Sequence, residues 1–282
     1  MSERRVKALV LTGYGINCER EMARGFELAG AEPVIAHLAD VLDGRVALID
    51  HHILAFPGGF SFGDHLGSGR ALANRLRTGA FWDDLRAFVA AGRYVWGVCN
   101  GYQAMVKLGL LPALQGLGVQ EVSLAANDSG RFEDRWVSLK VTASSPCVYT
   151  AGLERLYLPS RHGEGRWVGR PEVANRLIDE GFVPVQYAID DGMATEAYPA
   201  NPNGSPLGIA GMCDASGRIF GLMPHPEAFL DFTNHPRWTR LKLDLKRQGR
   251  PVPTEGQGVR LFRNVVDHAA AHLLGEPALA ES

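Results

Sequence analysis

Short apolar runs separated by helical patterns fill the first third of the chain. The runs are continuous rather than alternating, and they cover Lys7 to Thr12, Pro33 to His37, His52 to Phe56 and Tyr94 to Val98. Continuous apolar runs of this length are typical of strands covered on both faces. Strands that alternate with helices indicate an open, mostly parallel sheet of the doubly wound kind, so the predicted fold class is α/β.

Two segments between these runs have a helical pattern. The first is predicted from Cys18 to about Leu28, with Asn17 as its N-cap and Gly30 as its stop. The second covers residues 67 to 93 and is predicted to break near Gly79, because glycine weakens a helix interior. The helices therefore connect successive strands of the sheet.

The pattern changes after the first third, where apolar and polar residues alternate from Gly118 to about Val141. Alternation of this kind indicates antiparallel strands that are packed on one face, and thus an antiparallel extension of the sheet. Further strands are predicted at about 154 to 158, 182 to 189, 207 to 213 and 218 to 223. Residues 160 to 166 and 198 to 204 are rich in Gly, Pro or Asn and are predicted to be irregular.

The composition is that of a globular domain with no strong bias. The chain has 282 residues, of which 46% are hydrophobic, and its net charge is -2, which argues against nucleic-acid or membrane partners. We expect one domain over residues 1–275, a mobile tail at 276–282, and a cytoplasmic location, since no signal peptide or membrane span is seen. The four cysteines form no Cys-x-x-Cys pair, so neither a metal site nor a disulfide framework is predicted.

The candidate nucleophile lies where the fourth apolar run ends, in the sequence Gly97-Val98-Cys99-Asn100-Gly101. A strand that turns sharply into a helix between two glycines exposes its central side chain above the sheet. A sulfur at the start of a helix is in a site that favours negative charge, and the thiolate is the reactive form. Cys99 is therefore a candidate nucleophile, and the N–H of Asn100 a candidate oxyanion donor. The alternative is a small buried cysteine in a tight turn.

A glycine-rich loop, Pro57 to Asp64, follows the third apolar run. In open α/β sheets ligands bind beyond the carboxyl ends of the strands, where this loop and the Cys99 turn are both expected. Backbone N–H groups near Gly59 or Phe60 would then supply a second oxyanion donor. The alternative is a turn without a ligand, and a phosphate loop is excluded because the Gly-Lys-Ser/Thr ending is absent.

A second candidate pair follows the last predicted strand, in the sequence Pro224-His225-Pro226-Glu227. The prolines are expected to prevent a helix from starting at the histidine. In extended backbone, residues two apart project to the same side, so Glu227 can orient the ring of His225 and stabilise its charged form. Alone such a pair is more often a surface accident, but its position after a strand favours a base with its orienting carboxylate.

Taken together, these motifs resemble those of class I (triad) glutamine amidotransferases, which carry a Cys-His-Glu site on a flavodoxin-like sheet. Within that family they resemble the glutaminase subunits of phosphoribosylformylglycinamidine synthase, an enzyme of purine biosynthesis. The resemblance covers about residues 6 to 232 and 256 to 270. It is carried by residues 97 to 103 and 224 to 227 and by residues 56 to 64, 127 to 133, 162 to 165 and 201 to 205.

The resemblance implies a reaction and a role for each residue of the triad. Cys99 would attack the carboxamide of L-glutamine and form a glutamyl thioester that water then hydrolyses. His225 would act as the base and then as the acid for the departing ammonia, and Glu227 would orient His225.

The resemblance also implies the residues that bind the substrate. Backbone groups of Gly59 and Asn100 match the oxyanion hole of the family. Gln103 and the backbone of Gly163 and Glu164 match its glutamine-holding positions. No metal or cofactor is implied for this chain.

The family delivers ammonia to a synthetase subunit, which converts formylglycinamide ribonucleotide to formylglycinamidine ribonucleotide with ATP and magnesium. The resemblance therefore implies that this subunit, and a small accessory subunit, are partners on other chains. Two departures from the family pattern stand out: Ala228 occupies a position where arginine is common, and residues 233–255 are extra.

The residues leave other functions open. An α/β-hydrolase-like cysteine hydrolase would share the turn at Cys99, but that fold orders its triad as nucleophile, acid and histidine, whereas Glu227 follows His225 here. A papain-like protease lacks support because Cys-Gly-x-Cys-Trp is absent. A glutamine amidotransferase of another pathway, or a regulatory protein that has lost turnover, are the remaining alternatives.

The extra segment has a composition of its own. Between Asn234 and Arg250 it holds six basic residues and one acidic residue, Asp244. Trp238, Leu241 and Leu245 recur at helical spacing, which predicts a short amphipathic helix that ends near Gly249. We expect this helix either to lie on the surface of its own subunit or to dock on the synthetase through its basic face.

Overall fold

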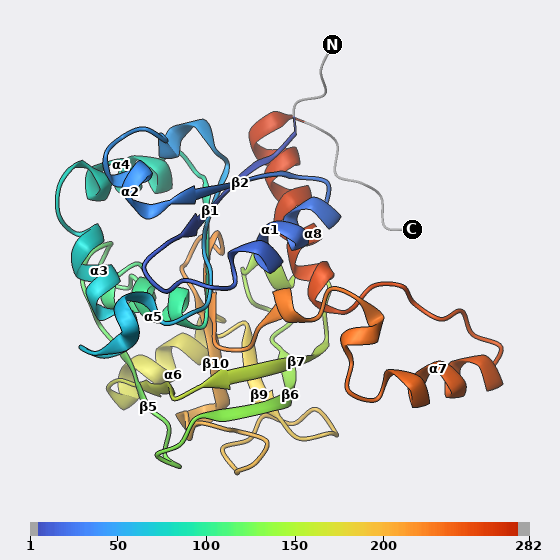
Figure 1. The fold of residues 1–282 in the computed structure, drawn as a ribbon. Helices are drawn as coiled ribbons and strands as arrows, with labels where there is room; N and C mark the ends of the chain where they lie inside the picture. The colour runs from blue at the N-terminus through green and yellow to red at the C-terminus, as the bar shows by residue number, and fades with distance from the viewer. Residues whose placement is uncertain (1–4, 276–282) are drawn as a thin grey trace.

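The computed structural model describes residues 5–275, and within them the main sheet has nine strands (Figure 1). The predicted tail at 276–282 lies outside the described residues. The strands of this sheet are, in spatial order, β2 (Glu32–His37), β1 (Lys7–Thr12), β3 (Ile53–Phe56), β4 (Tyr94–Val98), β11 (Ile219–Leu222), β10 (Ile209–Cys213), β9 (Val185–Ala188), β6 (Glu133–Val141) and β7 (Arg155–His162).

The sheet has a parallel half and an antiparallel half. The pairs from β2 through β1, β3 and β4 to β11 are parallel, and the pairs from β11 through β10, β9 and β6 to β7 are antiparallel. The predicted α/β class with an antiparallel extension is therefore confirmed. A separate antiparallel pair is formed by β5 (Ser123–Ala126) and β8 (Glu164–Val168).

Helices cover the sheet or extend from it. Their bounds are α1 (Glu19–Leu28), α2 (Leu38–Leu42), α3 (Arg70–Leu76), α4 (Ala80–Ala90), α5 (Asn100–Leu108), α6 (Pro171–Asp179), α7 (Trp238–Arg247) and α8 (Gly258–Ala269). Among residues 5–275, no helix combines the length and the apolar character that a membrane crossing requires.

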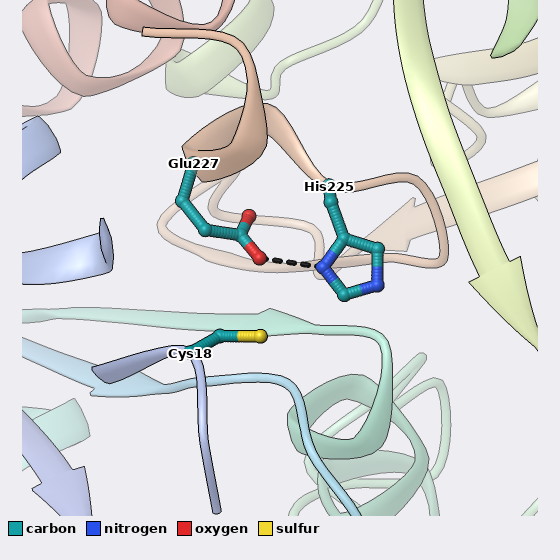
Figure 2. Close-up of side chains that lie close together, drawn as sticks. All are labelled: Cys18, His225 and Glu227. Carbon is teal, nitrogen blue, oxygen red and sulfur yellow. Dashed lines mark hydrogen bonds and ion pairs between the residues drawn. The ribbon is translucent and has the colours of Figure 1, made fainter. Parts of the chain in front are cut away.

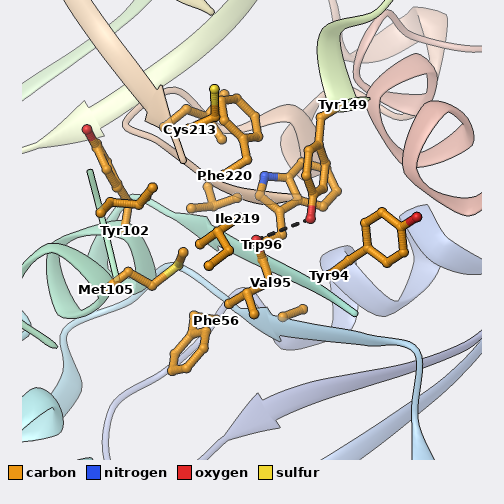
Figure 3. Packing of buried hydrophobic residues seen from close by; sticks show 14 of the residues in the cluster. Phe56, Tyr94, Val95, Trp96, Tyr102, Met105, Tyr149, Cys213, Ile219 and Phe220 are labelled. Carbon is orange, nitrogen blue, oxygen red and sulfur yellow. Dashed lines mark hydrogen bonds between the residues drawn. The ribbon is translucent and has the colours of Figure 1, made fainter. Parts of the chain in front are cut away.

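Successive side chains of β4 point to opposite faces of the sheet, and helices pack against both faces. Trp96 packs against Phe26 of α1 and Phe262 of α8, with ring centroids 6.0 and 4.5 Å apart. On the other face, Gly97 leaves the space that α5 needs, because a Cβ there would lie 2.9 Å from the backbone nitrogen of Tyr102. The central strand is thus buried on both sides, as its continuous apolar sequence predicts (Figure 3).

Register sets the position of the functional loops. Phe56 of β3 pairs with Gly97 of β4, and Gly97 pairs with Gly221 of β11. The carboxyl ends of these three parallel strands therefore reach the same edge of the sheet. The loop after Phe56, the Cys99 turn and the Pro224 to Glu227 turn all start at that edge.

Two local predictions are wrong. Cys18, not Asn17, is the N-cap of α1, and no side chain caps that helix. Residues 160 to 166 are not irregular, because β7 continues to His162 and β8 begins at Glu164. The glycines at 163 and 165 resemble a loop in sequence, yet the backbone there pairs with β5 and β6.

Residues 233–255, here called the basic arm, extend from the body of the molecule and carry α7 (Figure 1). Their base is fixed by hydrogen bonds from Phe232 N to Thr254 O (2.9 Å) and from Gly256 N to Leu230 O (2.7 Å). None of the residues of α7 is buried. The predicted short helix is therefore confirmed, and its docking on the synthetase stays a prediction.

Candidate active site

The turn between β4 and α5 holds Cys99 in a conformation that non-glycine residues rarely adopt, with φ 50° and ψ −107°. A hydrogen bond from Cys99 N to Leu222 O (2.9 Å) anchors this turn to β11. Gly101 is required next to it, because a Cβ there would overlap the carbonyl of Phe56. The close approach of helix and strand presents the sulfur at the edge of the sheet, as the sequence predicts.

The glycine-rich loop after β3 is bound directly to this turn. The side-chain oxygen of Asn100 accepts a hydrogen bond from Ser61 N (3.0 Å), and its amide nitrogen donates to Asp64 Oδ1 (3.1 Å). Asp64 has φ 54°, so the loop is held in a strained form by these bonds. The expectation that the two loops face each other is confirmed.

The predicted oxyanion donors are the backbone N–H groups of Asn100 and Gly59. Asn100 is the first residue of α5, so its N–H has no acceptor within the helix. Gly59 lies in an isolated bridge with Ile16 and has φ 148°, and a Cβ there would lie 2.6 Å from the carbonyl oxygen of Gly15. Glycine is thus needed where the loop passes the β1–α1 connection, and a donor at Gly59 stays a prediction.

His225 and Glu227 form a hydrogen-bonded pair, with 2.5 Å between Nδ1 and Oε1 (Figure 2). Both side chains are buried, with exposed fractions of 4% and 1%. The backbone differs from the prediction, because a short 3-10 helix, η5 (Pro226–Ala228), starts at the proline. Proline is well suited to the first turn of a helix, so this short turn, rather than extended backbone, brings the two side chains together.

The surroundings of His225 favour its charged form. Burial alone would lower the pKa of the imidazole, but the charge of Glu227 and the neighbouring sulfurs of Cys99 and Cys18 outweigh it, so the pKa of His225 lies well above its usual value. Within the described residues, Nε2 of His225 and Oε2 of Glu227 have no hydrogen-bond partner. The ring is therefore oriented by one nitrogen and leaves the other one available.

The residues predicted to hold the substrate also meet at this edge. Gln103 Nε2 donates to the carbonyl oxygen of Glu164 (2.5 Å), and the carboxylate of Glu164 accepts from Ser68 N (3.1 Å). The carbonyl of Gly163 accepts from Asn127 N (3.0 Å). These bonds connect the β7–β8 junction to α5 and to the segment that precedes α3.

The Cys99 turn, the loop after β3, the β7–β8 junction and His225 line one cavity of about 330 Å³. Its volume falls at the lower end of the range for small-molecule sites. Predicted residues of all three classes line it, namely Gly59, Cys99, Gln103, Gly163, Glu164 and His225.

The cavity wall also contains residues that were not predicted as site residues, among them Cys18 and His162. Cys18 follows β1 and lies beside the imidazole of His225. Its position depends on the parallel pairing of β1 with β3, which brings the carboxyl ends of both strands to one edge and which the local sequence does not specify. His162 is buried between Asn127 Oδ1 and Ser160 Oγ, both at 3.0 Å, and burial chiefly lowers its pKa to about 3.

The chain also matches known proteins. Residues 5–269 match the family model of the CobB/CobQ-like glutamine amidotransferase domain. The chain belongs to this family.

Relatives are similar over nearly the whole length. The phosphoribosylformylglycinamidine synthase subunit PurQ of Dehalococcoides mccartyi is 44% identical, with 94% of this chain and 98% of that protein aligned. The subunit of the same name from Methanococcus maripaludis strain C7 is 41% identical, with 93% and 97% aligned. A solved chain in the structure of PurLQS from Thermotoga maritima is 27% identical, with a TM-score of 0.66 and with 94% of this chain and 99% of that chain covered.

Proposed function

We propose that this chain is the glutaminase subunit of a phosphoribosylformylglycinamidine synthase and that it supplies ammonia from L-glutamine to a synthetase subunit in purine biosynthesis. The observation that carries this proposal is the buried His225–Glu227 pair, whose histidine lines the same cavity as Cys99 in a chain of the glutamine amidotransferase family. The relatives that share almost its full length carry the corresponding name.

The triad would act in two stages. His225 takes the thiol proton of Cys99, and the thiolate attacks the carboxamide carbon of glutamine. The charged imidazole, stabilised by Glu227, then gives its proton to the departing ammonia and leaves a glutamyl thioester. Water, deprotonated by His225, hydrolyses this thioester and releases glutamate.

Backbone and amide groups would hold the substrate during these steps. The N–H groups of Asn100 and Gly59 would bind the developing oxyanion, and each missing donor typically costs about 10² to 10³ in rate. Gln103 and the backbone of Gly163 and Glu164 would hold glutamine. ATP and magnesium belong to the synthetase in this proposal, and a cytoplasmic location stays a prediction.

Other functions fit less well. An α/β-hydrolase requires its acid before its histidine, and the structure joins His225 to the glutamate that follows it. A glutamine amidotransferase of another pathway would share the triad, but it would not use formylglycinamide ribonucleotide as the acceptor.

The experiment measures ammonia release from L-glutamine by the full chain, alone and with its synthetase, ATP, magnesium and formylglycinamide ribonucleotide. We expect the lone chain to release ammonia slowly and the complex to release it about 10² to 10³ times faster. A factor of this size is the effect of one oxyanion donor that docking would bring into position. The Gly58–Gly59 turn is the candidate donor switch, because glycine changes φ at low cost. Full turnover by the lone chain would contradict this coupling, and no release in the complex would contradict the function.

A further inference from the structure

One group of three side chains in the active-site wall has the composition of a metal site. Within residues 5–275, potential ligand atoms of Cys18, His225 and Glu227 lie within 4.8 Å of one another. Figure 2 shows that the sulfur of Cys18 points toward the bonded edge of the His225–Glu227 pair. Cys18 comes from the β1–α1 connection, and the other two residues come from the turn after β11.

The proposed hydrolysis uses His225 and Glu227 but gives no role to Cys18. Of the two buried atoms of this pair that have no hydrogen-bond partner among the described residues, Glu227 Oε2 belongs to the carboxylate of this group, whereas His225 Nε2 lies on the side of the ring turned away from Glu227 (Figure 2). The glycine at position 58 borders the group, because a Cβ there would lie 2.8 Å from the ring of His225 and 3.3 Å from the sulfur of Cys18. A thiol, an imidazole and a carboxylate thus lie close together beside the cavity, and one carboxylate oxygen has no partner among the described residues.

Ligand chemistry decides which cation this set would take. Magnesium and calcium prefer oxygen ligands, whereas one sulfur, one nitrogen and one carboxylate oxygen suit zinc or cobalt. Three protein ligands also leave a fourth position open to water, which the adjoining cavity can supply. We propose that Cys18, His225 and Glu227 form a binding site for a thiophilic divalent cation of the zinc type, and that its occupancy inhibits the glutaminase.

The binding step is balanced without a further reactant. Cys18 gives its thiol proton to solvent as the metal–sulfur bond forms, and the charged His225 gives a second proton to solvent and binds as the neutral imidazole. Metal–ligand bonds of about 2.0 to 2.3 Å require the three side chains to close around the ion and the direct His225–Glu227 bond to open. The inhibitory part rests on the proposed function, because the ion would remove the base that activates Cys99.

Cobalt is the probe, since thiolate–cobalt bonds produce a charge-transfer absorption that reports the sulfur ligand. The full chain is titrated with Co²⁺, then with Zn²⁺ in competition, for wild type, Cys18→Ser, Cys99→Ser and Cys147→Ser. Cys147 is a buried thiol away from the cavity and is the matched control. We expect the absorption in wild type, Cys99→Ser and Cys147→Ser, and at least about a tenfold weaker affinity in Cys18→Ser.

The variants also separate the alternatives. Unchanged cobalt affinity in Cys18→Ser, or loss of the absorption in Cys99→Ser with retention in Cys18→Ser, would overturn the site. Thermal unfolding of Cys18→Ser and of a second variant, Cys18→Ala, checks that weaker binding does not reflect misfolding.

Inhibition is tested on the complex with its synthetase. Zinc should inhibit glutamine-dependent turnover of wild type and Cys147→Ser, with recovery on addition of a chelator, and Cys18→Ser should need at least about tenfold more zinc. Equal zinc sensitivity of Cys18→Ser would overturn the inhibitory role. Cobalt binding by the chain is measured without turnover, so a failure of the proposed function leaves the metal test intact.

Discussion

The turn from Pro224 to Glu227 and the basic arm follow each other along the chain, but they are stabilised in opposite ways. His225 and Glu227 are almost fully buried, and the backbone N–H of His225 donates to Pro159 O (2.7 Å). In the basic arm, α7 has no buried residue, and the side chains of Arg240 and Arg247 are 78% and 71% exposed. The His225–Glu227 turn is therefore packed within its own subunit, whereas α7 is not.

The base of the basic arm connects the two regions. Glu255 forms two hydrogen bonds of 2.6 Å with Arg263 of α8, and His235 packs against the rings of Trp136, Tyr157 and Phe229. Only the end of the arm is uncovered, and an isolated helix of ten residues is marginal in water. Burial therefore orders the turn, whereas α7 is exposed, and the role of each is a matter for experiment.

The largest effect is expected at the nucleophile. Cys99→Ser should lower glutamine-dependent synthesis by the complex about 10⁴-fold or more, because the hydroxyl is not activated as the thiolate is. Synthesis from added ammonium salts should be unchanged, since the synthetase needs only ammonia. The measurement is product formation with each nitrogen source, and Cys147→Ser is the matched control. Normal glutamine use by Cys99→Ser would remove the assignment.

A smaller loss is expected when the ring of His225 is only disoriented. His225→Ala removes the base, whereas Glu227→Gln keeps a hydrogen-bonding side chain and changes only its charge. By analogy with other triads, the loss in kcat for Glu227→Gln should be about 10- to 100-fold milder than for His225→Ala. Steady-state rates of ammonia release measure both. Equal losses would show that Glu227 does more than orient the ring.

Buried His162 should make the stability of this region depend on pH. Its pKa in the folded state is about 3, against about 6.5 when unfolded, chiefly because burial disfavours the charged ring. As pH falls, the unfolded chain takes up a proton at His162 before the folded chain does. The contribution of neutral His162 to the free energy of unfolding is therefore fully present above pH 6.5 and is lost as pH falls toward 3. This loss is several kcal/mol at most, on the order of 1.36 kcal/mol per pH unit.

His162→Gln should make that dependence shallower, because glutamine can bond to Asn127 and Ser160 without titrating. Urea unfolding of wild type and variant at several pH values between 7.5 and 4 measures the slope. A slope identical to that of wild type would assign the acid sensitivity to other groups.

The parallel half of the sheet and the reactive turn could be predicted because their signals are local. Burial on both faces leaves an unbroken apolar run at Tyr94 to Val98, and the flanking glycines of Cys99 mark a close approach of helix and strand. The pairing of His225 with Glu227 was also predicted, although its short 3-10 turn was not.

The misses have a common physical origin in contacts between distant segments. The strand at Glu164–Val168 exists because it pairs with β5, and its glycines alone indicate a loop. Cys18 belongs to the cavity only because β1 and β3 are neighbours in the sheet. Helix α6 and helix α8 were not predicted either.

The smallest effect on the folded chain is expected at the end of the basic arm. Substitutions there also test the contrast between the buried turn and the exposed helix α7 most directly. Arg240 and Arg247 share one acidic neighbour, Asp244, at 3.7 and 3.9 Å, which leaves most of the positive charge of α7 uncompensated. If this charge meets an acidic surface of the synthetase, the triple variant Arg240→Glu, Lys246→Glu, Arg247→Glu should slow association about tenfold at low salt, with a smaller effect at high salt.

The stability of the lone chain should hardly change, because exposed charges contribute about 0 to 1 kcal/mol. Arg24→Glu, Arg86→Glu, Arg176→Glu is the matched control, since it makes the same charge change at exposed positions of α1, α4 and α6. Association kinetics with the synthetase at two salt concentrations, together with thermal unfolding, measure both variants. Equal slowing by the two triples would indicate a general charge effect, and unchanged association of the arm variant at low salt would show that the basic arm does not dock.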